Sequence, residues 1–153
     1  MPLPLVQFLA ILLTAIALVP GGAHLLELPN KIGLAQEPYF IVQQVYRGWA
    51  LLGLVLIAAI VADVYLTVRL RTQPVAFRLS LAGALCVAAT LVIFFVWVFP
   101  GNQATHNWLT VPANWQALRV RWEYGHAASA LLTLVGLALL VAATVNSKPD
   151  AGA

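Results

Sequence analysis

The chain has 153 residues, of which 62% are hydrophobic and only 8% are charged. A soluble domain carries roughly 25% charged and about 45–50% apolar residues, so this composition excludes a water-soluble globule and a disordered chain. The eight Lys and Arg residues outnumber the five Asp and Glu residues by too little to indicate a nucleic-acid partner. A single cysteine excludes a disulfide framework and a cysteine-based zinc site. What remains is an integral membrane protein with the lipid bilayer as its partner.

Four stretches are apolar and long enough to cross a bilayer, which takes about 20 residues in a helix. Lipid offers no water to unpaired backbone groups, and the stretches do not alternate polar with apolar residues, so they are expected to be helices rather than barrel strands. They cover residues 3–19, 49–68, 79–99 and 127–145. The sequence predicts an all-α membrane protein, an antiparallel up-and-down bundle of four transmembrane helices in one domain over residues 1–153. Residues 146–153 are predicted to form a disordered tail.

The connections between these stretches differ in length and polarity. Residues 69–78 form a short basic connection, whereas residues 20–47 and 100–121 are long and contain Tyr, Trp, Gln and Asn. In an up-and-down bundle both long connections lie at the same end, which we call the polar end. Lys and Arg divide equally between the two ends, but a compact basic loop is typical of the cytoplasmic side. We therefore expect both termini in the cytoplasm and the polar end outside it.

Two motifs at the polar end combine a histidine with a carboxylate three residues away. His24 and Glu27 follow the first stretch, and Glu123 and His126 open the fourth. On a helix this spacing places both side chains of a motif on one face. Because the two helices run antiparallel and the order within the motifs is reversed, both pairs are expected to point into the bundle at similar depth.

Three interpretations of these two motifs stay open. With His106 as an extra nitrogen ligand, two histidines and one or two carboxylates would suit a mononuclear iron or another transition metal that reacts with oxygen. A full di-iron set is missing, because the other helices offer Gln43 and Asn102 where carboxylates would be needed. The second interpretation is a metal-free cluster that binds or acts on a ligand. The third is a structural network that includes Arg119, four residues before Glu123.

Aromatic residues gather at the polar end. An interfacial belt would place such residues at both membrane surfaces, but the opposite end has only Tyr65 and Phe77. The one-sided enrichment favours a ring-lined pocket as well as a belt, and such a wall suits a flat aromatic or quinone-like molecule. The residues are Tyr39, Tyr46, Trp49, Trp97, Trp108, Trp115, Trp122 and Tyr124.

Two residues inside or next to the apolar stretches call for a local explanation. Asp63 is the one acid deep in a span, and we expect it to pair with Arg69 or Arg71. Pro20 and the two glycines after it are expected to end the first helix, since proline removes a helical hydrogen bond and glycine loosens the backbone. Signatures of serine nucleophiles, phosphate loops and nucleotide folds are missing from the sequence.

Three segments resemble a known family: residues 22–31, 45–49 and 112–127. The last is the most distinctive, because it contains Trp-Glu-Tyr-Gly-His-Ala at residues 122–127, preceded by further Trp and Arg residues. Together the segments resemble small four-span bacterial membrane proteins of unknown function that are grouped with the anthrone oxygenases, and the likeness covers most of the chain. The resemblance implies a four-helix bundle in the bacterial inner membrane. For anthrone oxygenases proper it also implies oxidation of a polycyclic anthrone to an anthraquinone by O₂, without a bound organic cofactor.

The sequence thus predicts a membrane oxidoreductase or oxygenase that acts on a lipophilic aromatic or quinone-like substrate. The two histidine–carboxylate motifs would supply metal ligands or proton acceptors, and Arg119 or Arg47 would stabilise a developing oxyanion. The expected catalytic residues are His24, Glu27, Arg119, Glu123 and His126. The expected substrate-binding residues are Gln43, Tyr46, Arg47, Trp49, Asn102, Trp108 and Trp122.

Two other functions compete with this prediction. The first is a haem-binding or electron-transfer subunit, with His24 and His126 as axial ligands from facing helices. The second is a non-catalytic membrane subunit or binding protein. A channel or transporter is disfavoured, because four spans with one buried acid give no continuous polar path unless several copies associate in a homo-oligomer.

Overall fold

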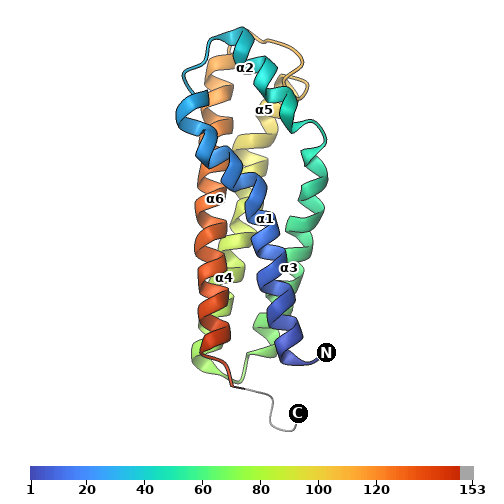
Figure 1. Ribbon diagram of the computed structural model, residues 1–153, viewed down its shortest axis with the longest axis vertical. Coiled ribbons are helices and arrows are strands. Elements are labelled where there is room, and N and C mark those ends of the chain that lie inside the picture. The colour runs from blue at the N-terminus through green and yellow to red at the C-terminus, as the bar shows by residue number, and fades with distance from the viewer. Residues whose placement is uncertain (149–153) are drawn as a thin grey trace.

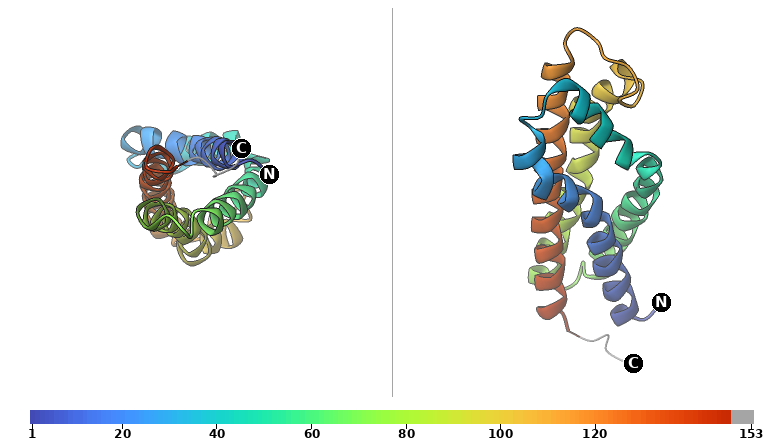
Figure 2. Two further views of the ribbon diagram at one scale, coloured as in Figure 1. Left: turned by 90° about the horizontal axis from the view of Figure 1, so that it is seen from below. Right: turned by 45° about the horizontal axis from the view of Figure 1, so that its top comes forward.

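The computed structural model describes residues 1–148, and four long helices form its body (Figure 1). The helices are α1 (Leu3–Lys31), α3 (Leu52–Arg69), α4 (Pro74–Ile93) and α6 (Trp115–Val145). Viewed along the bundle they form a ring, in which α1 packs on α3 and α6, and α4 packs on the same two helices (Figure 2, left). The predicted all-α bundle of four membrane-length helices is confirmed.

Short elements cover the polar end, opposite the two termini (Figure 1). Between α1 and α3 lie helix α2 (Gln36–Gln43) and two 3₁₀ turns, η1 (Gln44–Tyr46) and η2 (Trp49–Leu51). α4 is followed by a π-helical turn, η3 (Phe94–Val98), and by α5 (Phe99–Ala104). The wide turn precedes Pro100, which has no N–H to bond the carbonyl of Val96 as a regular α-helix requires. Turns of this kind often occur at functional sites.

The first helix is longer than the sequence predicted. Pro20 does not end the helix. Instead, α1 continues to Lys31 and leans across the bundle in its second half (Figure 1). The missing hydrogen bond of a proline can be accommodated by a bend. Gly21 then lets α1 approach α6 closely, since a Cβ at this position would lie 3.4 Å from the Cα of Ala130. As a result, His24 lies on a helical backbone facing α6.

The interior divides into two clusters of different chemistry. An aliphatic core at the end of the termini joins all four long helices and the connection between α3 and α4, and an aromatic cluster lies at the polar end. The aliphatic core consists of Leu3, Val6, Ala10, Leu66, Leu70, Ala76, Leu140 and Ala143. The aromatic cluster consists of Tyr39, Val98, Trp108, Trp115 and Trp122.

One prediction for the end of the termini, the partner of Asp63, needs correction. Asp63 is fully buried, and its carboxylate accepts a hydrogen bond from the Thr14 hydroxyl at 3.1 Å, because the side chain points into the bundle and faces α1. After α6, Ser147 accepts a hydrogen bond from Gln7 at 2.6 Å, and Lys148 bonds with the side chain of Gln73. Residues 149–153 of the predicted tail lie outside the described part of the chain.

Candidate functional site

A cavity of about 670 Å³ lies inside the bundle at the polar end, between α1, α3, η3 and α6. Ligand-binding cavities usually measure about 300–1,000 Å³, so this one can hold a molecule of several fused rings. Nine of the residues that the sequence predicts for the site line it: His24, Gln43, Tyr46, Arg47, Trp49, Asn102, Trp108, Trp122 and His126. The structure therefore brings both histidines and all seven expected substrate-binding residues to one cavity.

The two histidines meet across the α1–α6 contact. Their ring centroids are 4.1 Å apart and the ring planes enclose 30°, so the imidazoles face each other in direct contact. Trp122 meets both rings edge-on, at 4.9 Å from His24 and 4.3 Å from His126. Tyr46 lies 4.3 Å from His24 on the side of η1. Rings thus surround the imidazole pair, which leaves the ring nitrogens as polar groups on an apolar wall.

Three buried polar atoms of the cavity wall have no hydrogen-bond partner among residues 1–148. They are Nδ1 of His24, Oε1 of Gln43 and Nε1 of Trp108, and each of the three side chains is only 3% exposed. An unpaired buried polar group costs about 1–3 kcal/mol, so a bound molecule that pairs with these atoms would be strongly favoured. The wall offers it a donor at Trp108 and an acceptor at Gln43.

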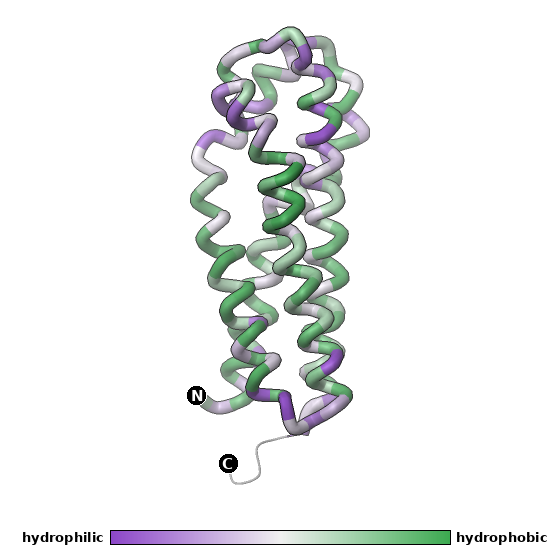
Figure 3. The backbone as a smooth tube through the Cα atoms, turned by 180° about the vertical axis from the view of Figure 1, so that it is seen from behind, coloured by the Kyte–Doolittle hydropathy of each residue, from purple (hydrophilic) through white to green (hydrophobic). Residues whose placement is uncertain are grey.

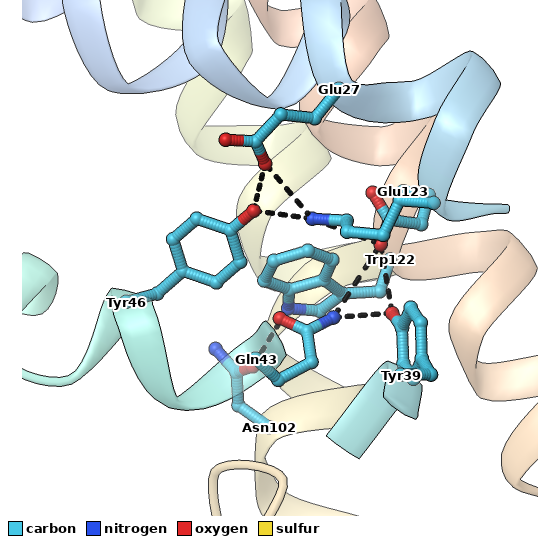
Figure 4. Close-up of polar contacts among 8 residues, drawn as sticks. Glu27, Tyr39, Gln43, Tyr46, Asn102, Trp122 and Glu123 are labelled. Atoms are coloured by element: carbon cyan, nitrogen blue, oxygen red, sulfur yellow. Dashed lines mark hydrogen bonds and ion pairs between the residues drawn. The ribbon is translucent and has the colours of Figure 1, made fainter. Parts of the chain in front are cut away.

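The two carboxylates belong to a different cluster, built around a buried ammonium group. Lys31 is 3% exposed, and its Nζ lies 3.4 Å from Glu27 and 3.2 Å from Glu123. Its Nζ also donates to the Tyr46 hydroxyl at 2.6 Å, and that hydroxyl in turn donates to Glu27. Figure 4 shows Glu27, Tyr46 and Glu123 converging from three sides. The ammonium group links α1, η1 and α6 and offsets the charge of the buried Glu123.

Helix α2 closes this cluster from the polar end. The Tyr39 hydroxyl donates to Glu123 at 2.8 Å, and the amide nitrogen of Gln43 donates to both Tyr39 and Glu123 (Figure 4). Burial raises the pKa of Tyr39, and the carboxylate of Glu123 raises it further. Burial and the hydrogen bond to Glu27 likewise raise the pKa of Tyr46. Both phenols therefore stay protonated at neutral pH and act as donors to the carboxylates.

This separation of histidines from carboxylates bears on the predicted metal and haem sites. Within residues 1–148, no group of three or more His, Cys, Asp or Glu side chains is placed to hold a metal ion. His106 is exposed and is not among the residues that line the cavity. For haem, the porphyrin plane would have to lie between two axial imidazoles, and the contact of His24 with His126 at 4.1 Å leaves no space for it. The arrangement fits neither group.

The two arginines expected to stabilise an oxyanion differ in position. Arg119 donates to the backbone carbonyl of Leu34 at 2.6 Å and lies over the ring of Trp115 at 4.7 Å, and it does not line the cavity. It fastens the segment between α1 and α2 to α6. Arg47 lines the cavity at the polar end, where it is exposed and bonds Gln44 at 3.0 Å. Of the two, only Arg47 can reach a molecule in the cavity.

Trp108 reaches the cavity from a strained turn. The backbone at His106, Asn107 and Trp108 has φ values of 47°, 57° and 64°, a left-handed conformation that non-glycine residues seldom adopt. The hydroxyl of Thr105 holds this turn by accepting the backbone N–H of Trp108 at 2.9 Å. Strain of this kind often occurs where a side chain must be positioned for binding.

Sequence reasoning missed Lys31 and Tyr39 as parts of the site. From the sequence, Lys31 is only one more charge of the polar end, although its position four residues after Glu27 indicates an ion pair on one helix face. Tyr39 belongs to the aromatic residues of the polar end, and its hydrogen bond to Glu123 depends on the fold.

We compared the chain with models of protein families, with curated proteins and with solved structures, and none of these comparisons gave a match.

Proposed function

We propose that the protein is a membrane oxygenase that oxidises a planar, lipophilic aromatic or quinone-like substrate in the cavity at its polar end. The observation that carries the proposal is the pair of facing imidazoles, His24 and His126, on the wall of a ring-lined cavity of about 670 Å³. A histidine in such a place can accept a proton from the substrate. The resemblance to anthrone oxygenases points to the same chemistry.

The proposed reaction begins at a methylene group conjugated with a carbonyl, as in anthrone. A histidine removes one proton, and the negative charge spreads to the carbonyl oxygen, where the unpaired N–H of Trp108 would stabilise it. The carbanion then reacts with O₂. One oxygen atom becomes the new carbonyl group, and the other leaves as water with the two methylene hydrogens. The stoichiometry is R₂CH₂ + O₂ → R₂C=O + H₂O, which balances without a further reductant.

The remaining wall residues would bind and orient the substrate. Trp49, Trp122 and Tyr46 offer ring faces and edges to a flat polycycle, and Gln43 offers an acceptor for a hydroxyl group. The Lys31 cluster lies behind Tyr46 and Trp122, with Nζ 4.4 Å and 5.2 Å from the two ring centroids, and would hold these rings in place. In a bacterial inner membrane, the basic connection would face the cytoplasm and the cavity would lie near the periplasmic side.

The test is an oxidation assay with anthrone as the probe, using purified protein in detergent and recording both O₂ uptake and anthraquinone formation. Spontaneous oxidation in protein-free detergent is subtracted. We expect the variant that removes the general base, His24→Gln or His126→Gln, to lower the enzymatic rate by about 10²–10⁴-fold. Arg121→Gln is the matched control, because this side chain is exposed and outside the cavity and the new residue is again glutamine.

Three results would contradict the proposal. The first is a wild-type rate no higher than that in protein-free detergent. The second is an equal rate for wild type and both cavity variants, which would exclude the imidazoles as bases. The third is an equal loss in the Arg121→Gln control, which would show that the loss does not come from the cavity.

A second candidate is a non-catalytic binding protein for the same class of molecule. The observation that favours it is that neither imidazole of the pair makes a hydrogen bond within residues 1–148, whereas a catalytic histidine is usually oriented by a carboxylate or carbonyl. In the same preparation it predicts quenching of tryptophan fluorescence by anthraquinone, with no oxidation of anthrone above the spontaneous rate.

A further inference from the structure

The cavity is open along one side of the bundle. Its wall includes six residues of η2 and α3 and five residues of α4 and η3, and some of these are exposed although they line the cavity. On η2 and α3 these are Ala50, Gly53 and Ile57, which follow one face of the continuous helical segment. On the facing side Phe95 is 59% exposed. Residues that both line a cavity and face outward mark its mouth, which therefore lies between α3 and η3.

The seam between α3 and α4 is closed at the other end of the bundle. There Leu66 and Leu70 pack with Ala76 and Leu79 in the aliphatic core. In Figure 3 the tubes of α3 and α4 lie close together near the termini and separate toward the polar end. The mouth is thus a local opening of one helix–helix seam.

The opening lies at a depth where lipid surrounds the protein. Gly53 and Ile57 belong to the span Trp49–Arg69, and Phe95 belongs to the span Pro74–Ala104. Ile57 lies about two helical turns, or about 12 Å, further along the span than Trp49. Only the upper edge of the opening, near Arg47 and Asn107, is polar. Most of the opening therefore faces hydrocarbon rather than water.

From this placement we infer that the cavity takes its ligand sideways from the bilayer, through the opening between Gly53 and Ile57 of α3 and Phe95 of η3. The inference rests on the proposed function as far as the ligand class is concerned. It restricts that class to molecules that are dissolved in the membrane, such as uncharged polycyclic ketones and quinones. A charged analogue of the same ring system would stay in the water and would not reach the opening.

Gly53 offers a way to narrow the opening without disturbing the fold. A Cβ at this position would meet no atom within 4 Å, so a larger side chain can extend into the free space at the mouth. Its neighbour Leu54 is 71% exposed and does not line the cavity, so the same new side chain at Leu54 would point to lipid. Gly53→Phe and Leu54→Phe therefore form a matched pair on one helix.

The experiment measures tryptophan quenching after rapid mixing of the protein, in phosphatidylcholine vesicles, with neutral anthraquinone or with anthraquinone-2-sulfonate. We expect Gly53→Phe to slow quenching by neutral anthraquinone at least about tenfold, as a narrowed gate does, and Leu54→Phe to leave the rate within about twofold of wild type. Phe95→Ala, which widens the mouth, is expected to speed it. The sulfonate is expected to quench at least about tenfold more slowly than the neutral compound, because its charge disfavours the hydrocarbon layer.

The outcomes separate this inference from the proposed function. If neutral anthraquinone quenches the wild type but neither Gly53→Phe nor Phe95→Ala changes the rate, side entry is wrong and the ligand pocket stands. If the sulfonate quenches as fast as the neutral compound in all variants, entry is from the water and the inference is overturned. If neither compound quenches the wild type, the cavity does not bind this class of ligand, and the proposed function fails together with the inference.

Discussion

The same four helices pack closely at one end of the bundle and surround a cavity at the other end. At the end of the termini, small and branched aliphatic side chains such as Val6, Ala10 and Leu140 are almost completely buried where the helices pack together. At the polar end, large rings such as Trp108 and Trp122 surround a cavity of about 670 Å³. The first end is expected to supply most of the packing energy, because close packing is what an apolar helix can gain inside a lipid bilayer.

The difference also shows where polar groups are tolerated inside the membrane. The cavity wall leaves polar atoms of His24, Gln43 and Trp108 unpaired, whereas the buried acid nearer the termini, Asp63, is hydrogen-bonded to Thr14. Unpaired buried groups cost stability and are kept where a ligand uses them. We therefore expect the polar end to be less stable than the end of the termini, because its unpaired groups are kept for a ligand. Variants at both ends test this difference.

Removing the buried ammonium group should be the most damaging single change. Lys31→Met leaves Glu123, which is fully buried, without its positive partner, and breaking a buried ion pair in this way costs about 3–5 kcal/mol. We expect a large drop in the free energy of unfolding, measured with denaturant in detergent micelles. The double variant Lys31→Met/Glu123→Gln should recover much of the loss, because it no longer buries an unpaired charge. Equal instability of the single and double variants would contradict the ion-pair explanation.

The packing of α4 on α6 should tolerate almost no extra volume. A Cβ at Gly136 would lie 2.8 Å from Cγ2 of Val87 and 3.0 Å from the backbone carbonyl of Gly83, which cannot rotate away. We therefore expect Gly136→Ala to destabilise the protein by about 1–3 kcal/mol in the same unfolding assay. Gly22→Ala is the matched control, because its Cβ meets nothing within 4 Å and alanine favours a helix by up to about 1 kcal/mol. A stable Gly136→Ala variant would show that this helix pair is looser than described.

The buried acid nearer the termini depends on one hydroxyl donor. Within residues 1–148, Thr14 is the side chain that donates a hydrogen bond to the Asp63 carboxylate. Thr14→Val removes this hydrogen bond, and we expect the free energy of unfolding to fall by about 1–3 kcal/mol. Thr133→Val serves for comparison, since the Thr133 hydroxyl donates only to the carbonyl of Ser129 on its own helix. If both variants lose the same small amount, Asp63 does not need the hydroxyl of Thr14.

The features that depend on local pattern could be predicted from the sequence. Apolar length predicts the four spans, and the spacing of three residues predicts a shared face for each histidine and its carboxylate if both lie on a helix, as they do on α1 and on α6. The one-sided set of rings predicts a ring-lined cavity, and Trp49, Trp108 and Trp122 do line it. In each case the signal lies within one segment or in the up-and-down order of the helices.

The choice of partners could not be predicted, because it is decided between segments. The sequence suggests that Glu123 acts with His126 or Arg119, but in the folded chain Lys31 and Tyr39 take its charge and its hydrogen bond. Pro20 likewise fails to end its helix, since contacts with α6 hold the chain helical beyond it. Both results depend on the angle at which α1 crosses the bundle, and no short pattern contains that angle.

The smallest expected effect lies in the turn that carries Trp108. His106 is exposed but has a φ of 47°, so its side chain makes the backbone conformation costly while adding little contact. His106→Gly should relieve this strain and raise the free energy of unfolding by up to about 1 kcal/mol, because glycine adopts positive φ readily. His106→Val should lower it by about 1–2 kcal/mol, since a branched side chain resists the left-handed region.

The same pair of variants distinguishes a structural role of this turn from a direct contribution of the His106 imidazole to binding. If the turn serves only to hold Trp108 in the cavity wall, His106→Gly keeps Trp108 in place and leaves anthraquinone quenching unchanged. His106→Val, in contrast, should weaken quenching together with stability, because the turn shifts when its backbone cannot keep positive φ. Weaker quenching in His106→Gly with unchanged stability would instead show that the imidazole itself contributes to binding, against its exposed position.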